Sequence, residues 1–472
     1  MIHEKPHGPK RLHCRELDGT RTGILVLNDE TIELYFVGYN EFVHVSEDEP
    51  IYVVTEEGNV ASLHANVSGR HSSKGVATKF AGKDRGRGSD EYRSIYQGGI
   101  ISNVALLGVD AWRADDLVRR LSFDVPQTER VLRHLEKVQA LGRVSHPSDE
   151  ELALYRAEAG NVTLTARYAA TYGIDTRSLT AYRPTFSIEF AAGISLDEME
   201  THLVRYLSFL SFVLGVRLVP AAVRADRLSF QDMVRAIEAG TYVGDHEVMW
   251  NWAADEHEAR ELAFHGAPFL AADDAELAAL ETGLAEWVIR SDEWERAYIA
   301  MIESLSLRRV ISGERLLAAW RWFEELPNAK ADRTLDETAI EPLVRAASDA
   351  AHDQGLGDME NRIRGCLRPI GKETLRDRFA RLIDTLRERF CRDELFDGMI
   401  DHLKNPHDFR GRVAHGHFSP RDESEWRRFN KTTLAIEALC FLLTARDLPM
   451  TDASRQRIWQ HPVLESYRLA YP

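Results

Sequence analysis

Cysteine is scarce in this sequence, and disulfide-rich or zinc-ribbon folds are not expected. The 472 residues contain four cysteines, Cys14, Cys366, Cys391 and Cys440, and none belongs to a Cys-x-x-Cys pair. Closely spaced cysteine pairs are the usual signature of zinc ribbons and small disulfide scaffolds. The sequence also lacks the His-Glu-x-x-His, Gly-x-Ser-x-Gly and dinucleotide-binding glycine motifs. We therefore expect no bound metal, no cofactor and no serine or cysteine nucleophile.

Long hydrophobic runs are also missing. The most apolar stretch, 203–220, is interrupted by Arg205 and Arg217 and is too short and too charged to cross a bilayer. The first seventeen residues are polar and carry no apolar core of a secretory signal. The sequence therefore predicts a cytoplasmic protein with no membrane partner.

Net positive charge is absent, but the negative charge is unevenly distributed. The formal net charge is −16, and residues 371–472 contain 18 Lys and Arg against 16 Asp and Glu, so the first 370 residues carry −18. Nucleic-acid binding requires a locally basic surface. The charge balance is therefore compatible with a nucleic-acid partner for the C-terminal part and gives no positive support for one.

The hydrophobic pattern predicts an α+β protein with a β-rich antiparallel N-terminal domain followed by an all-α helical bundle. Short β-branched runs occur at 23–28, 31–37, 41–46, 51–55, 60–66, 95–107, 117–125, 161–169 and 183–191, with few amphipathic helices between them. This spacing favours an antiparallel sandwich or barrel-like domain over a parallel sheet. Residues 127–141 and 149–159 are predicted to be helical insertions.

The pattern changes to helical spacing after residue 193. Ser195 and Glu198 form a capping-box sequence before apolar residues at 196, 199, 203, 207 and 210. Further helices are predicted from 273 to 447. We accordingly divide the chain into a β-rich regulatory or sensor domain at 1–193, a mixed, mostly helical connecting region at 194–305, and an α-helical domain at 306–472.

A basic, glycine-rich segment lies between residues 70 and 93. It includes Lys79, Lys83, Arg85 and Arg87. Such a segment could contact RNA or an acidic partner protein, but a solvated surface loop is the more common explanation of this composition.

One short stretch, 402–418, combines residues with catalytic potential. Pro406 is expected to end one helix, and Asp408 is a candidate N-cap for the next. Arg410 and His415 are separated by about 140° on a regular helix, so they would converge only at a helix end. Arg412, about 60° from His415, is the geometrically easier neighbour.

An arginine and a histidine are sufficient for one type of RNA cleavage. Imidazole accepts and returns a proton near neutral pH, and guanidinium binds a phosphate through two hydrogen bonds. RNA itself supplies the nucleophile, the 2′-hydroxyl beside the scissile phosphate. The spacing alone is also compatible with a structural or surface role for His415.

The sequence Arg410-x4-His415-Gly416, placed after a proline-interrupted helix pair and before a long closing helix, resembles the HEPN domain signature. Helices expected at 315–326, 375–390 and 430–446 extend this resemblance. Together with the β-rich front end, the layout is similar to the ApeA-like HEPN proteins of bacterial anti-phage abortive infection.

The resemblance implies a metal-independent endoribonuclease that pairs two protomers, so that both Arg-His sets line one cleft. It implies His415 as general acid and base and Arg410 as the phosphate clamp, with Arg412 and His417 as supporting candidates. It further implies RNA, with tRNA as the expected target, a homodimer formed through the HEPN domain, and a phage-derived protein as the trigger.

One position departs from the family pattern. The residue after the motif arginine is commonly Asn, Asp or His, and here it is Gly411. Two other interpretations therefore stay open. One is a non-catalytic HEPN-type dimeric binding or sensor module, and the other is a regulator whose front domain binds a small molecule.

Overall fold

The structure is a computed structural model that describes residues 10–19, 21–27, 32–38, 50–64, 96–102, 104–126, 128, 131–142, 148–172, 179–250, 266–332, 337–367, 372–403, 406–416 and 418–470. The chain forms two compact units. The sheet unit comprises Met1–Leu207, Leu218–Arg260 and Ala271–Asp273. The helical unit comprises Ser208–Arg217, Glu261–Leu270 and Asp274–Pro472.

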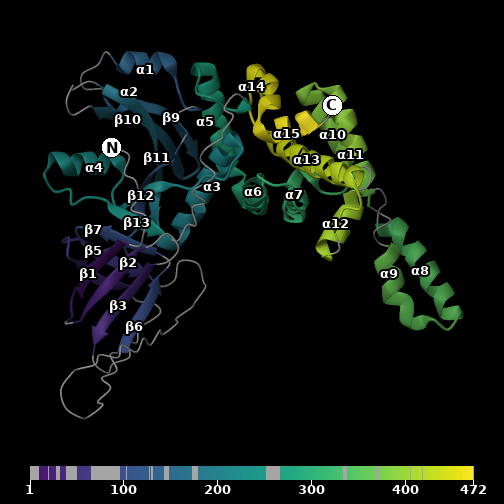
Figure 1. The fold of residues 1–472 in the computed structure, drawn as a ribbon, viewed down its shortest axis with the longest axis horizontal. Coiled ribbons are helices and arrows are strands. Elements are labelled where there is room, and N and C mark those ends of the chain that lie inside the picture. Colours follow the sequence, from purple (N-terminus) through teal and green to yellow (C-terminus); the bar gives the residue numbers. More distant parts are fainter. Residues whose placement is uncertain are drawn as a thin grey trace, which may run out of the picture. The chain divides into compact units, whose positions relative to one another are not determined.

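The sheet unit contains a thirteen-stranded antiparallel sheet (Figure 1). The strands are β1 (Lys10–Glu16), β2 (Thr22–Leu27), β3 (Ile32–Gly38), β4 (Ile51–Thr55), β5 (Val60–His64), β6 (Tyr96–Ser102), β7 (Val104–Gly108), β8 (Val118–Asp124), β9 (Ala153–Ala159), β10 (Val162–Tyr172), β11 (Leu179–Ile194), β12 (Ala221–Asp226) and β13 (His246–Trp250). Their order is β6-β3-β2-β1-β4-β5-β7-β13-β12-β8-β11-β10-β9. The α+β class, with an antiparallel sheet before a helical region, is confirmed.

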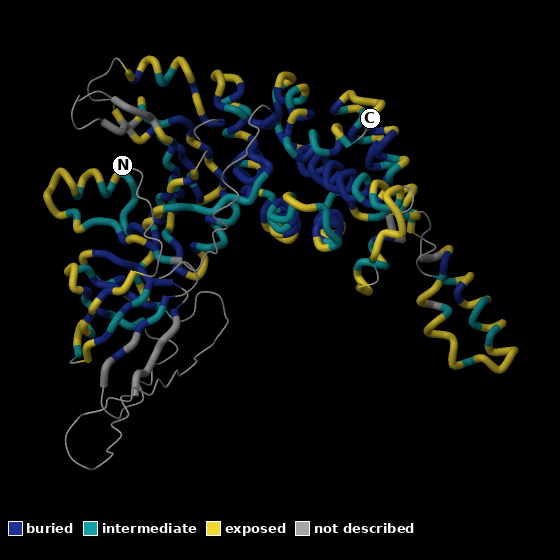
Figure 2. Tube along the Cα trace, viewed as in Figure 1, coloured by how far each residue is buried: buried dark blue, intermediate teal, exposed yellow. Residues whose placement is uncertain are grey.

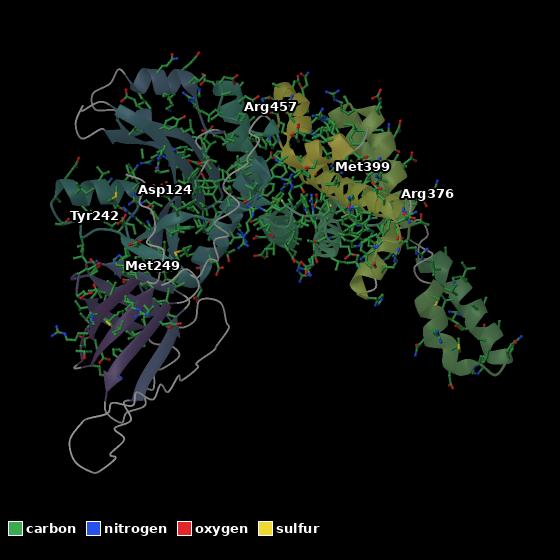
Figure 3. All side chains as sticks on the ribbon, viewed as in Figure 1. Asp124, Tyr242, Met249, Arg376, Met399 and Arg457 are labelled. Atoms are coloured by element: carbon green, nitrogen blue, oxygen red, sulfur yellow. The ribbon has the colours of Figure 1, made fainter. Side chains whose placement is uncertain are left out.

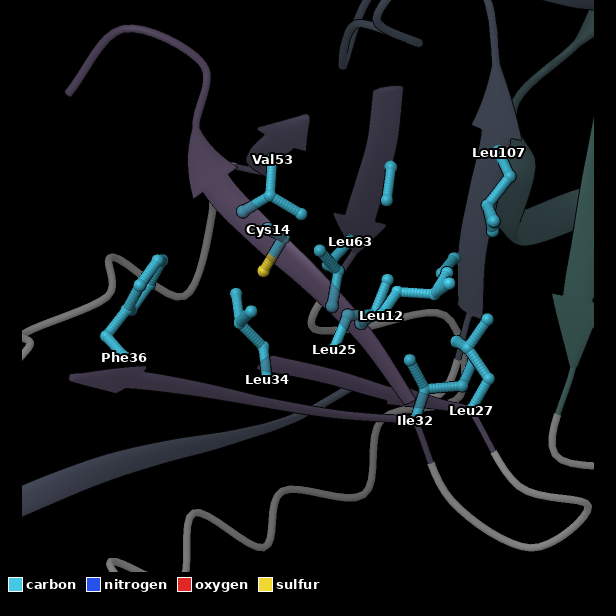
Figure 4. Packing of buried hydrophobic residues seen from close by; sticks show 12 residues of the cluster. Leu12, Cys14, Leu25, Leu27, Ile32, Leu34, Phe36, Val53, Leu63 and Leu107 are labelled. Atoms are coloured by element: carbon cyan, nitrogen blue, oxygen red, sulfur yellow. The ribbon is translucent and has the colours of Figure 1, made fainter. Parts of the chain in front are cut away.

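Alternation of apolar and polar residues creates one core inside this sheet. In β2 every second side chain is buried, and β2 pairs antiparallel with β3 in the register Leu27↔Ile32, so the apolar runs predicted at 23–28 and 31–37 are neighbouring strands. Inward-facing side chains from β1, β2, β3, β4, β5 and β7 pack together, as Figure 4 shows. Cys14 belongs to this cluster, and burial raises the pKa of its thiol to about 11.

The predicted helix at 149–159 is largely wrong. Only α2 (Asp149–Leu152) is helical, and 153–159 forms β9, which pairs with β10 from Val162↔Ala159 to Arg167↔Ala153. Its Ala, Leu and Glu residues favour helix locally. Backbone hydrogen bonds to β10 and burial of Leu154, Tyr155 and Ala157 outweigh that propensity.

Other parts of the sheet unit differ in extent from the sequence expectation. In place of a helix over 127–141, the structure has α1 at Leu135–Leu141, and α4 lies at Phe230–Glu238. The strands β1, β12 and β13 were not predicted. The predicted strand at 41–46 and the basic segment with Lys79, Lys83, Arg85 and Arg87 lie outside the described residues.

The helix predicted after residue 195 is confirmed as α3 (Leu196–Leu214). The Glu198 carboxylate accepts hydrogen bonds from the backbone N–H and hydroxyl of Ser195, both at 3.0 Å. These bonds hold the pKa of Glu198 below its usual value. The apolar residues at 196, 199, 203, 207 and 210 are all buried.

The helical unit contains the end of α3 and eleven further helices in the part of the chain that the structure describes. They are α5 (Asp274–Ile289), α6 (Ser291–Ser306), α7 (Gly313–Glu325), α8 (Glu337–Asp353), α9 (Glu360–Leu367), α10 (Leu375–Phe390), α11 (Asp393–His402), α12 (Pro406–Ala414), α13 (Glu423–Ala445), α14 (Asp452–Arg457) and α15 (Pro462–Ala470). None of the described helices combines the length and apolar character needed to cross a bilayer.

Helix α13 is the centre of this unit and is buried along most of its length (Figure 2). Phe441 on α13 stacks on Phe212 from the end of α3 at 4.7 Å between ring centroids, and Phe212 also packs on Trp287 of α5. Arg457, labelled in Figure 3, forms a 2.9 Å ion pair with Glu276 of α5. Residues 194–305, expected as a connecting region, belong partly to the sheet unit and partly to the helical unit.

Candidate functional site

The Arg-x4-His sequence lies on α12, which begins at Pro406 and ends at Ala414. Proline is favoured in the first turn of a helix, because its fixed backbone angle suits the start and its missing N–H would have no intrahelical acceptor. The expectation that α11 ends before Pro406 is confirmed. The expected N-cap role of Asp408 is wrong, because this residue lies inside the first turn of α12.

His415 stands directly after the last residue of α12 and is exposed to solvent. Its backbone N–H donates to the Gly411 carbonyl at 3.1 Å, and Gly416 follows with a φ of +68°. A left-handed residue after a helix is the usual C-terminal stop and favours glycine. The helix therefore ends before His415, so Arg410 lies inside α12 and His415 lies just beyond its end. Among the described residues, no side-chain hydrogen bond or ion pair of His415 is present.

Arg410 is half-buried and bound to α7. Its Nη2 lies 2.8 Å from Oε1 of Glu324, and its guanidinium carbon lies 5.2 Å from the ring centroid of Trp320. The same Glu324 oxygen accepts a hydrogen bond from Trp320 Nε1 at 2.8 Å. The carboxylate thus binds both the arginine and the indole, and the Arg410 side chain is 36% exposed to solvent.

Arg412 faces a different set of partners. Its Nη1 donates to the Glu425 carboxylate of α13, and its Nη2 donates to the Ser419 carbonyl at 3.0 Å. Hydrogen bonding from Arg412 is the main reason that the pKa of Glu425 is lowered. The guanidinium also lies 5.3 Å from the Phe418 ring. Arg412 therefore ties the loop after His415 to the start of α13.

Aromatic side chains underlie this end of the unit. Phe418 stacks on Phe429 at 4.3 Å, Phe409 packs edge-on against Phe429, and Arg428 lies over Phe409 at 5.0 Å. The buried Phe409 anchors α12 to α13, so the two residues that follow it, Arg410 and Gly411, are held at the surface of a packed core.

Two glycines set the space around α12. A Cβ at Gly313, the first residue of α7, would come within 2.8 Å of Val413 Cγ1, so glycine here permits close approach of α7 and α12. A Cβ at Gly411 would meet no atom within 4 Å. A β-carbon at this position would therefore cause no steric clash.

The structure brings some candidate residues together and leaves others outside the description. Arg410, Arg412 and His415 lie on one helix and its terminus, with the two arginines bound to carboxylates on different helices. His417 and the four basic residues between 79 and 87 lie outside the described residues. Within the described ranges, no group of three or more His, Cys, Asp or Glu side chains could hold a metal ion.

Sequence reasoning did not identify Glu324 and Glu425 as parts of this site. Glu324 is preceded four residues earlier by Trp320, a spacing that places both on one helix face. That signal indicates a local contact only, because Arg410 is 86 positions farther along the chain.

Comparison of the chain with models of known protein families, with curated proteins and with solved structures found no match.

Proposed function

We propose that this protein is a metal-independent HEPN-type endoribonuclease that acts in anti-phage defence, with tRNA as the expected target. The observation that carries the proposal is the placement of an exposed histidine at the end of α12, with a half-exposed arginine one turn before it. A solvent-accessible imidazole and guanidinium on one short element are the groups that RNA transesterification needs.

In the proposed reaction the 2′-hydroxyl of RNA attacks the adjacent phosphorus, and the bond from phosphorus to the 5′-oxygen breaks. His415 of one copy accepts the 2′-hydroxyl proton, and the same residue of a second copy donates a proton to the leaving 5′-oxygen. Arg410 binds the phosphate and stabilises the negative charge that develops on it. The products are a 2′,3′-cyclic phosphate and a 5′-hydroxyl.

A homodimer is part of this proposal, because one imidazole cannot serve both ends of the transfer at the same time. A twofold axis would duplicate the Arg410 and His415 set in one cleft. We propose that the acidic N-terminal part, which carries the −18 charge, restrains RNA access until a phage-derived protein binds it. The proposed site of action is the cytoplasm.

The second candidate function is a non-catalytic dimeric binding or sensor module. The contact that favours it is the ion pair between Arg410 and Glu324, which occupies the arginine that a phosphate would need. For catalysis, the RNA phosphate has to displace the Glu324 carboxylate, or the other amino group of the Arg410 guanidinium has to bind the phosphate alone.

RNA cleavage in EDTA separates the two candidates. We expect full-length wild type to produce cyclic-phosphate ends and His415→Ala to lose cleavage by about 10²-fold or more, the usual contribution of general acid-base catalysis. Arg427→Ala is the matched control, because Arg427 is an exposed residue whose i,i+4 pair with Glu423 contributes little stability. Equal cleavage by wild type and His415→Ala would refute the proposed role of His415.

Glu324→Gln tests the interpretation of the ion pair. The amide keeps the shape of the carboxylate and releases the charge that holds Arg410, so an enzyme restrained by this pair should cleave faster. A binding module would show no cleavage in either form. Full-length protein is required for these assays, because a fragment that starts near residue 300 would lose Phe212 and Trp287 from the helical core.

A further inference from the structure

A cavity in the helical unit, away from the residues of α12, is lined by four arginines from three parts of the chain. Its volume is about 880 Å³, which falls within the range of small-molecule binding sites. The arginines are Arg389 at the end of α10, Arg392 before α11, Arg446 at the end of α13 and Arg455 on α14.

These cations are incompletely neutralised. Arg446 is paired with Asp447 and Arg455 with Asp452, and the Asp452 side chain is 86% exposed. Glu388 is the third carboxylate of the lining. Among the residues that the structure describes, neither Arg389 nor Arg392 forms an ion pair with a carboxylate. Four guanidinium groups therefore face three carboxylates, and the lining keeps a net positive charge.

The surroundings of Arg389 show the same excess of positive charge. Its Nη2 donates to the Leu448 carbonyl, while its buried Nε has no hydrogen-bond partner among the described residues. Burial lowers the pKa of Arg389, and the positive charges of Arg455 and Arg446 lower it further against the opposite effect of Asp447. An anion in the cavity would reduce the repulsion between these arginines and could accept hydrogen bonds from their guanidinium N–H groups.

We propose that this cavity binds a small ligand that carries two or more phosphate groups, of nucleotide size. Phosphate is favoured because planar guanidinium groups donate pairs of hydrogen bonds to its oxygens. Arg389 and Arg392 lie at the junction of α10 and α11, Arg446 follows α13 and Arg455 lies on α14, so a ligand with two or more phosphate groups can contact arginines from several of these parts at once. Thr385 and Gln456, which also line the cavity, supply neutral polar groups for the rest of the ligand.

Cys391 provides a direct readout of occupancy. It is an exposed free cysteine in the cavity lining, whereas Cys366 is an exposed free cysteine on α9 that does not line it. Cys14 and Cys440 are buried. The rate of alkylation at Cys391, measured beside that at Cys366 in the same full-length protein, therefore reports ligand at this site.

The experiment uses pyrophosphate and ATP as separate probes at low ionic strength. We expect at least one of them to slow alkylation of Cys391 several-fold and to leave Cys366 unchanged, with protection declining as salt rises. Arg389→Gln and Arg392→Gln should each weaken the apparent affinity about tenfold, because each removes a charge-assisted hydrogen bond. Arg427→Gln, which removes the same charge elsewhere in the unit, should leave the affinity unchanged.

Any of four results would overturn the proposal. The first three are no protection of Cys391 by either probe, equal protection of both exposed cysteines, and equal weakening by Arg392→Gln and Arg427→Gln. Protection of Cys391 by a single-stranded RNA oligonucleotide alone would also overturn it, since the surface would then bind the RNA backbone. Arg392→Gln is expected to fold normally, because the Arg392 side chain is exposed and makes no capping hydrogen bond at the start of α11. Its effect on affinity can therefore be interpreted even if Arg389→Gln fails to fold. None of these outcomes depends on RNA cleavage.

Discussion

Replacing Glu437 with leucine should strongly destabilise the helical unit. Glu437 on α13 and Arg315 on α7 are 1% and 3% exposed and form two hydrogen bonds, Nε to Oε1 at 2.6 Å and Nη2 to Oε2 at 2.7 Å. Glu437→Leu leaves the Arg315 charge buried without its partner. Breaking a buried pair from one side costs about 3–5 kcal/mol of unfolding free energy.

A second buried arginine increases the effect. Arg308 lies close to the pair, and burial together with the positive charge of Arg315 lowers its pKa to about 10 against the opposing effect of Glu437. Glu437→Leu removes that compensation from both arginines. We therefore expect a loss at the upper end of the range and a fall of roughly 10 °C in the melting temperature of the helical unit.

The double variant Arg315→Met/Glu437→Leu tests the reason for this loss. Both charges of the pair are then gone, and apolar side chains of similar volume fill the space. Arg308 loses the attraction of Glu437 and also the repulsion of Arg315, so most of the stability should return. Urea unfolding followed by circular dichroism measures the free energies of wild type, single and double variants. The reasoning is refuted if Glu437→Leu costs less than about 1 kcal/mol or if the double variant is no more stable than the single one.

Three further predictions concern packing, pH and the sheet unit. Gly313→Val should lower the melting temperature and the rate of the proposed RNA cleavage, because the added side chain would collide with Val413. An unchanged melting curve would contradict the close approach of α7 and α12. Burial holds the pKa of His461 well below its usual value, so the unfolded state binds a proton that the folded state excludes, and stability should fall as pH drops through about 6.5. Between pH 7 and pH 5, the unfolding free energy measured in urea should fall less for His461→Phe than for wild type. Equal falls would show that His461 does not cause the pH dependence. In the sheet unit, Asp226 accepts hydrogen bonds from Arg120 and the Tyr242 hydroxyl at 3.0 and 2.8 Å, so Asp226→Ala should cost about 3–5 kcal/mol in urea unfolding. A loss of unfolding free energy no larger than about 1 kcal/mol, as for an exposed ion pair, would show that water reaches Arg120 when Asp226 is removed.

Several local features were predictable because neighbouring residues determine them. The β2–β3 pairing follows from two alternating apolar runs, and α3 follows from the Ser195–Glu198 cap and the spacing of its leucines. The break before Pro406 was also predictable, although α12 begins at Pro406, three residues before the start that an Asp408 cap implied.

Features that depend on distant partners were not predictable. Residues 153–159 have helix-favouring composition and become β9 because β10 offers a backbone partner and a core. Strand β1 has a polar sequence, yet its alternate residues Leu12 and Cys14 are buried because β2 and β4 flank it. Propensity describes a segment alone, whereas sheet pairing is decided between segments.

The same distinction holds at the candidate site. The sequence by itself determined that Arg410, Arg412 and His415 lie within six consecutive positions, since that order is covalent. Tertiary structure decided which carboxylates bind the arginines: Glu324 from α7 and Glu425 from α13, which lie on opposite sides of the motif in the chain. Side-chain direction on packed helices depends on the crossing of those helices, and no local spacing encodes it.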